Sequence, residues 1–236
     1  MHDAQAPAML LPAIDRRSLS AAVTTRLRDL IVEGSLAPGA RLNERVLCEQ
    51  LAVSRTPLRD AFKTLAAEGL IDLLPNRGAQ VSRMAAPEIE QTFEVMGALE
   101  GLAGELACAR IQQPEVDEIR ALHFEMLAAH VRRDLPAYYR LNHAIHDRIN
   151  AAACNTVLTA TYLQINSRIQ SLRFRSNFNR EKWDVAVQEH SAMLDALERR
   201  DGAQLRSILM QHLRNKRDAV LANLQAAASA QPEPTS

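Results

Sequence analysis

Three histidines lie within apolar stripes of separate predicted helices. His146 follows Asn142 by one helical turn, and both lie in a segment whose apolar residues recur at helical spacing. His190 and His212 each continue such a stripe in a later segment. Buried imidazoles need polar partners, and one divalent cation can satisfy three of them at once. The pattern predicts a metal site formed by Asn142, His146, His190 and His212, with zinc as the expected ion and nickel or manganese as alternatives.

The other residues that could bind a metal have no such setting. We predict that the remaining histidines, His2, His123, His130 and His143, lie on the surface. The chain has 3 cysteines, far apart and in no Cys-x-x-Cys spacing, so neither a disulfide framework nor a thiolate zinc site is indicated.

A second group of residues suits contact with DNA. Arg55 and Arg59 are one turn apart at the start of a predicted helix, beside Thr56, and the fork of an arginine fits the O6/N7 edge of guanine. Arg45 in the preceding helix is placed to contact the DNA backbone or the minor groove, as are two residues of a hairpin tip. The predicted DNA-binding set is Arg45, Arg55, Thr56, Arg59, Arg77 and Gly78.

The elements that must position these arginines are short and closely spaced. A first helix of about four turns ends at Gly34, a second covers 44–51 with Asn43 as its N-cap, and a third covers 55–68. Two extended runs follow at 70–74 and 79–82, joined by a Pro-Asn-Arg-Gly turn. Three helices and a small β-hairpin predict a winged helix-turn-helix over residues 16–84.

The second half of the chain reads as consecutive helices, which must carry the histidines. We predict helices at 87–111, 114–133, 136–152, 156–175, 180–200 and 202–224, and no strand. The predicted fold class is therefore mainly α: an N-terminal winged helix-turn-helix, then an antiparallel all-α helical bundle over 85–225. Residues 1–15 are predicted to form a flexible arm and residues 226–236 a disordered tail.

Charge supports this division. The 236 residues include 28 basic and 28 acidic side chains, so the net charge is zero. Residues 16–83 nevertheless hold 11 Lys/Arg against 7 Asp/Glu, or 11 − 7 = +4, as expected if only this part approaches phosphates. No stretch is apolar enough for a membrane span and no secretory signal is present, so we expect a cytoplasmic protein.

The string PGARLNERVLCEQLAVSRTPLRDAFKTLAAEGLIDLLPNRGAQVS, residues 38–82, resembles the DNA-binding domain of the GntR superfamily of bacterial transcriptional regulators. Leu58, Asp60 and Phe62 are mild variants of its motif. The resemblance implies a homodimer that binds a short palindromic operator in double-stranded DNA, and not an enzyme. It places the family's DNA contacts on Arg45, Arg55, Thr56, Arg59 and Gly78.

The second half resembles the FadR-like branch of that superfamily, whose C-terminal FCD-type domain is an all-helical bundle. Asn142-x-x-x-His146, the pair Glu189-His190, and His212 match the motifs that hold a metal at the floor of an effector cavity. The resemblance implies a small organic acid as effector. Two positions depart from the family pattern: Met96 stands where an effector-binding arginine is common, and Asn142 replaces an aspartate.

With Asn142 and three neutral imidazoles as ligands, a bound divalent cation would keep its charge, which we expect to attract a carboxylate. The candidate effector-binding positions are Met96, Arg168 and Arg173. The predicted function is a transcriptional regulator, with repression as the commoner arrangement, whose operator affinity responds to the effector. A metal-dependent, hydrolase-like enzyme and a regulator with a purely structural metal are the alternatives.

Overall fold

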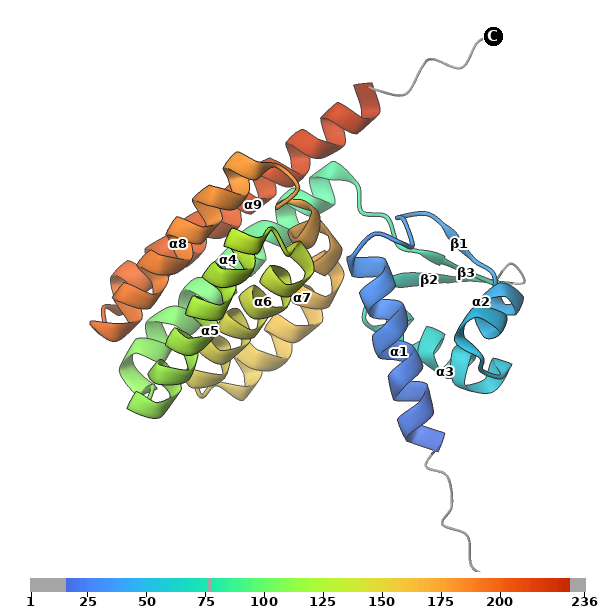
Figure 1. The fold of residues 1–236 in the computed structure, drawn as a ribbon, viewed down its shortest axis with the longest axis horizontal. Helices are drawn as coiled ribbons and strands as arrows, with labels where there is room; N and C mark the ends of the chain where they lie inside the picture. The colour runs from blue at the N-terminus through green and yellow to red at the C-terminus, as the bar shows by residue number, and fades with distance from the viewer. Residues whose placement is uncertain (1–15, 76–77, 230–236) are drawn as a thin grey trace, which may run out of the picture.

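The computed structural model describes residues 16–75 and 78–229. Figure 1 shows a small N-terminal unit beside a bundle of long helices. The N-terminal unit combines three helices with a three-stranded antiparallel sheet of order β1-β3-β2, which confirms the predicted winged helix-turn-helix. Its elements are α1 (Arg16–Val32), β1 (Arg41–Leu42), α2 (Glu44–Leu51), α3 (Arg55–Ala67), β2 (Ile71–Leu74) and β3 (Gly78–Val81).

Local signals in the sequence set the ends of the N-terminal helices. The Asn43 side chain accepts a hydrogen bond from the Val46 amide and caps α2, as predicted. Ser54 stands at the N-cap position of α3, but its side chain makes no capping hydrogen bond. After α3 the chain reverses through Gly69, whose φ of +74° is a left-handed conformation that glycine adopts without strain.

The strand β1 was absent from the sequence-based prediction. It has two residues, and it pairs with β3 through the register Arg41↔Gln80 and Leu42↔Ala79. A run of two residues is too short to show the alternation of apolar and polar residues that predicts a strand. The strand β1 is therefore recognised only from its pairing with β3. The hairpin of β2 and β3 is antiparallel, with Leu74 opposite Gly78. Of the predicted turn, Arg77 lies outside the described residues.

The C-terminal bundle consists of six helices over the described residues, and successive helices run in opposite directions (Figure 1). The bundle confirms the predicted all-α class. In the part of the chain that the structure describes, no helix combines the length and the apolar character that a membrane span requires. The helices are α4 (Ala86–Arg110), α5 (Gln113–Arg132), α6 (Leu135–Ala152), α7 (Thr156–Arg175), α8 (Arg180–Glu198) and α9 (Gly202–Ser229).

The last helix is longer than predicted. It continues to Ser229, so residues 226–229, assigned to a disordered tail, are helical. Alanine has the highest helix propensity of the amino acids, and the Ala-rich sequence around 226–230 lets the helix continue past Leu224. Residues 1–15 and 230–236, the predicted arm and the rest of the tail, lie outside the described residues.

Close packing of α4 against α9 brings the centre of the bundle together. A Cβ atom added at Gly104 would lie 2.5 Å from Leu209 Cδ1, so a larger residue at this position would force the leucine side chains of α9 to move. Apolar clusters surround the centre: one joins α5, α6 and α8 to parts of α4 and α9, and another joins α4, α7 and α9. The polar residues of the candidate site therefore lie inside a closely packed frame.

Helix α7 lies between the two units, beside α1 in Figure 1. The Ser167 hydroxyl donates a hydrogen bond of 2.8 Å to the carbonyl of Glu68, the residue that follows α3. The Arg168 side chain covers Gly69, and a Cβ atom added there would lie 2.9 Å from Arg168 Cγ. A bundle helix thus makes direct contact with the end of the third helix of the winged unit.

Candidate metal centre and nucleic-acid interface

Three histidines from three helices meet in the interior of the bundle. His146 lies on α6, His190 on α8 and His212 on α9, and one ligand nitrogen from each falls within 4.8 Å of the other two. All three side chains are buried. Asn142 is also buried and lies one turn from His146 on α6. The structure thus brings together the three histidines predicted from separate stripes and places Asn142 beside one of them.

The Nδ1 atom of each ring lies beside an acceptor oxygen. His190 Nδ1 donates to the Ala186 carbonyl at 2.7 Å, and His212 Nδ1 donates to Glu189 Oε2 at 2.6 Å. His146 Nδ1 lies 2.8 Å from the Glu100 Oε2 atom. Carbonyl and carboxylate oxygens only accept, so they select the tautomers that carry hydrogen on Nδ1. Each Nε2 then presents a lone pair, the arrangement that metal-binding histidines use.

The facing Nε2 atoms fit a cation better than they fit each other. His146 Nε2 and His190 Nε2 are 3.2 Å apart, and burial lowers the pKa of all three imidazoles, which keeps the rings neutral. Two neutral rings with Nδ1 hydrogens have no proton to share between these atoms. Asn142 Oδ1 and His212 Nε2 are also buried, and neither has a hydrogen-bond partner among the described residues. The residues present therefore fit a divalent cation.

A buried ion pair lies beside this cluster. Arg173 Nη1 on α7 donates to Glu100 Oε1 on α4 at 2.7 Å and to Asn166 Oδ1 at 3.1 Å. Burial alone would raise the pKa of Glu100, but Arg173 and His146 outweigh it and hold that pKa at about 2. Arg173 Nη2 is buried and has no hydrogen-bond partner in the part of the chain that the structure describes. A cationic donor adjacent to a metal-type cluster can bind an anion.

The sequence reasoning did not assign Glu100 and Lys216 to the site. Both are buried, at 3% and 5% exposure, and Glu100 contacts both His146 and Arg173. A signal existed: Glu100 lies one turn from buried Met96 on an inward stripe of α4, and Lys216 lies one turn from His212 on α9. A charged residue within an apolar stripe indicates a buried partner.

The predicted effector-binding residues separate into two groups. Arg173 lies at the cluster, whereas the structure does not bring Arg168 to it: Arg168 is partly exposed and pairs with Glu88 at the contact with the winged unit. Five residues along an α-helix correspond to about 140° around its axis, so the two arginines cannot share one face. Met96 is fully buried among apolar residues of α4, α7 and α9 and presents no charge to an anion.

The surface assignment of three other histidines was wrong. His123 is buried at 4% exposure, and its Nε2 lies 3.2 Å from the Ser191 hydroxyl. His130 is half-buried against Trp183 and pairs with Asp184, and His143 is half-buried and pairs with Asp147 one turn away. Tertiary contacts with α7 and α8, which a single stripe does not show, bury these rings. His2 lies outside the described residues.

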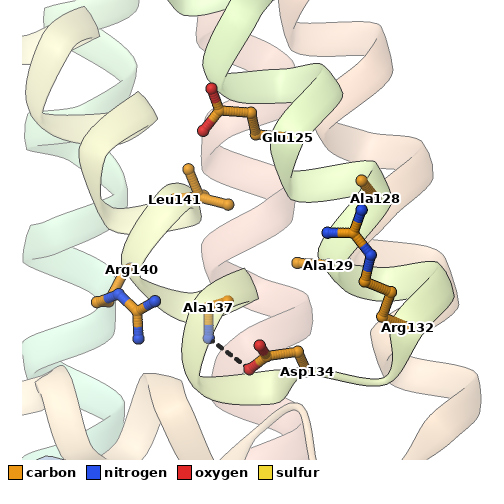
Figure 2. Close-up of a pocket in the computed structure, with 8 residues that line it drawn as sticks. All are labelled: Glu125, Ala128, Ala129, Arg132, Asp134, Ala137, Arg140 and Leu141. Carbon is orange, nitrogen blue, oxygen red and sulfur yellow. Dashed lines mark hydrogen bonds between the residues drawn. The ribbon is translucent and has the colours of Figure 1, made fainter.

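A hollow on the surface lies apart from this interior cluster. Figure 2 shows it between α5 and α6, with Arg132 and Arg140 from the two helices and Asp134, which accepts the Ala137 amide, in the turn between them. Alanines and Leu141 form much of its wall. None of the predicted site residues that the structure describes lines this hollow, so it is distinct from the histidine cluster.

The residues predicted to contact DNA lie on the exposed side of the winged unit. Arg55 and Thr56 are exposed at the start of α3. Arg59 pairs with Glu44 and Arg45 with Glu49, and both arginine side chains remain more than half exposed. Exposed ion pairs contribute little to stability, so these arginines can exchange a carboxylate for another anion at small cost. Gly78 is exposed at the start of β3, next to residues 76–77.

Two family descriptions match the chain. Residues 19–81 match the family described as "Bacterial regulatory proteins, gntR family", and residues 91–215 match the FCD domain. The second match covers more than half of the chain. The boundary between the two matched ranges coincides with the extended segment that joins β3 to α4.

Similar proteins agree with these matches. The HTH-type transcriptional repressor RspR of Escherichia coli (strain K12) is 26% identical over 195 residues, which is 82% of this chain and 85% of that protein. A probable D-xylose utilization operon transcriptional repressor of Paenarthrobacter nicotinovorans is 27% identical over 207 residues, covering 86% and 91%. Among solved structures, E. coli McbR/YncC shares the fold with a TM-score of 0.78 at 21% identity, over 87% of this chain and 98% of that one.

Proposed function

The chain belongs to the gntR family of bacterial regulatory proteins and carries an FCD domain, and from this premise we propose that it is a cytoplasmic repressor controlled by a small carboxylate. As a homodimer it binds a short palindromic operator. Its relatives are transcriptional regulators, so the hydrolase-like alternative is not retained. What remains to distinguish is a metal that takes part in effector binding from one that only stabilises the bundle.

Operator recognition rests on the start of α3. The exposed Arg55, Thr56 and Arg59 occupy the end of the helix that reaches base edges in the major groove. Arg45 on α2 and Gly78 in the wing are placed to contact the backbone, and we assign Arg77 the same role from its position in the sequence. Only the arginines of α3 have the geometry for bidentate contact with guanine, so they should set the sequence preference.

The metal site carries the second part of the proposal. The observation on which it rests is the 3.2 Å separation of His146 Nε2 and His190 Nε2, each on a ring whose other nitrogen faces an acceptor. His146, His190 and His212 would hold the ion, with Asn142 Oδ1 as a fourth ligand. Zinc suits this set best, and nickel or manganese are alternatives. When bound, the ion supplies a Lewis acid to which a carboxylate can bind.

The protein's own contribution to effector binding is positive charge in a dry interior. None of the four proposed ligands is anionic, so none of them neutralises the positive charge of the cation that would attract a carboxylate. Arg173 Nη2 offers a free donor next to the cluster, from α7 instead of from the α4 position that Met96 fills. Met96 stands where the resembled family commonly has an effector-binding arginine. We assign the role of that arginine to Arg173.

Helix α7 links that donor to the DNA-binding unit. Arg173 forms the interior ion pair with Glu100 and also donates to Asn166. Ser167, next to Asn166, donates to the carbonyl of Glu68 at the end of α3. An anion that draws Arg173 toward itself shifts the helix that contacts α3. Such a shift alters the spacing of the two recognition helices in a dimer and lowers operator affinity.

A thermal-shift screen tests this proposal. Zinc-loaded protein is heated with a panel of small carboxylates, with and without a chelator. We expect at least one compound to stabilise the protein by about 3 kcal/mol at 100 times its dissociation constant, and the stabilisation to disappear with chelator and in His190→Ala. The same compound should then weaken binding to an operator selected from random duplexes, measured by fluorescence anisotropy.

Two outcomes would contradict the proposal. Stabilisation that persists with chelator would place the effector away from the metal. If zinc raises the melting temperature but no carboxylate does, and operator affinity does not change, the metal is structural. Because relatives in the family act on DNA, loss of carboxylate binding would leave the DNA-binding assignment intact.

Substitution of Asn142 by aspartate separates metal binding from anion binding. Asn142→Asp places one negative charge among the neutral ligands, so zinc should bind more tightly while a carboxylate effector binds more weakly, by about tenfold. Isothermal titration of zinc and then of the effector measures both. Asn223→Asp, which adds the same charge at an exposed position of α9, should change neither. Tighter carboxylate binding by Asn142→Asp would refute the charge argument.

A further inference from the structure

Lys216 is a buried cation without a carboxylate close enough to pair with it among the described residues. Its ammonium donates to Asn177 Oδ1 in the segment between α7 and α8. Burial, and then the Arg173 guanidinium, lower the pKa of Lys216 to about 7, while Glu189 opposes this shift. A lysine in this state lacks a counter-ion, and an anion placed beside it would remove the cost of its burial.

Arg173 supplies a second cationic donor in the same region of the interior, close enough for its charge to lower the pKa of Lys216. Asn177 connects the two, since its side chain accepts from Lys216 and its Nδ2 donates to the Arg173 carbonyl at 3.2 Å. Arg173 Nη1 is taken by Glu100 and Asn166, and Arg173 Nη2 is buried without a partner. Two like charges held close together in a dry interior repel each other unless an anion lies between them.

A surface hollow shares one residue with this region. Asn177 forms part of the wall of a hollow of about 480 Å³, and the same side chain accepts a hydrogen bond from Lys216. The hollow has two arginines at its rim and an indole whose Nε1 is buried without a partner. Its lining residues are Arg133, Leu135, Asn177, Phe178, Arg180 and Trp183. The rim of the hollow is basic, as the approach of an anion requires.

The charged side chains around the histidine cluster favour a ligand with two negative charges. With Arg173 paired to Glu100, and Glu189 engaged by His212 and Asn215, Lys216 has no carboxylate of its own among the described residues, and neither has a divalent cation held by neutral ligands. A ligand with a single carboxylate could serve only one of these two places.

We propose that the effector is a dicarboxylate, with one carboxylate directed to the histidine cluster and the second bound by Lys216 Nζ and Arg173 Nη2. This inference rests on the proposed function, because the first carboxylate uses the metal site. His212 and Lys216 are one turn apart on α9, about 6 Å along the helix axis. That spacing suits a short aliphatic diacid.

The test compares acids that differ only in the second charge. Zinc-loaded full-length protein is titrated calorimetrically with succinate and glutarate, and with succinamate and glutaramate, in which one carboxylate is an amide. We expect at least one diacid to bind about tenfold or more tightly than its monoamide, the contribution of a hydrogen bond to a charged group. In Lys216→Met, which keeps an unbranched side chain one atom shorter and removes the charge, the ratio of the two dissociation constants should fall to near one.

Controls separate charge from packing. Lys216→Arg keeps the positive charge and should retain the preference for the diacid, whereas Lys182→Met removes an exposed lysine of α8 and should leave the preference unchanged. Arg173→Lys keeps the ion pair with Glu100 but loses Nη2, and should reduce the preference. Thermal melting of each variant with zinc verifies that it folds.

The possible results distinguish this inference from the function on which it rests. If monoamides bind as tightly as diacids in the natural sequence, or if Lys216→Met keeps the preference, the second carboxylate subsite is refuted and the monocarboxylate effector stands. If neither diacids nor monoamides bind and monocarboxylates also fail, the proposed effector site itself is wrong.

Discussion

Replacing both Arg55 and Arg59 by alanine is expected to weaken operator binding by about 30-fold or more. Each bidentate contact between arginine and guanine contributes about 1–3 kcal/mol of discrimination, and the double variant removes two of them from each protomer. Both side chains are exposed at the start of α3, and the pair of Arg59 with Glu44 is a surface pair. Stability should therefore change by less than about 1 kcal/mol.

A matched control removes the same charge from another surface. Arg132→Ala/Arg140→Ala deletes two exposed arginines that flank the hollow between α5 and α6 in Figure 2. Fluorescence anisotropy with the selected operator and with a scrambled duplex should show loss of preference only for the α3 variant. Equal losses in the two variants would mean that the arginines act through net charge alone.

Local signals explain why the helices could be predicted so closely. Asn43 caps α2 and the predicted range of 44–51 matches the observed helix. Asn155 caps α7 in the same way, and the predicted range of 156–175 matches that helix, because an asparagine that accepts an amide hydrogen marks a helix start. These signals act within a few residues, so a single sequence contains them. The missed strand β1 depends instead on pairing with β3, which is distant in sequence.

The candidate site was predictable where residues act through helix periodicity. His146, His190 and His212 each continue an apolar stripe, which places each on an inward face without specifying what it meets. The partners of those rings come from other helices: Glu100 from α4 and Arg173 from α7. The periodicity of a sequence shows on which face of its helix a charged residue lies. It does not show which other helix packs against that face. For this reason Arg168 and Arg173 were equal candidates until the packing of α7 separated them.

Loss of the Glu100 carboxylate is expected to be among the most destabilising single changes in the bundle. Glu100→Leu leaves the Arg173 guanidinium buried without its counter-ion, which costs about 3–5 kcal/mol. For a chain of this size the loss corresponds to a fall in melting temperature of about 6–20 °C. Chelator is present throughout, because Glu100 also faces His146 and a bound ion would add its own stabilisation.

The cause of that loss can be separated from the general effect of a substitution on α4. Glu105→Leu on the same helix removes the partner of Arg206 from an exposed pair, and should cost less than about 1 kcal/mol. The double variant Glu100→Leu/Arg173→Met replaces the buried pair by apolar side chains, and should recover most of the stability because no unpaired charge remains. If the double variant is as unstable as Glu100→Leu, uncompensated charge is not the cause. The loss would then come from the packing of α4 against α7 and α9, and Arg173 would be free of the constraint that aims its second donor at an effector.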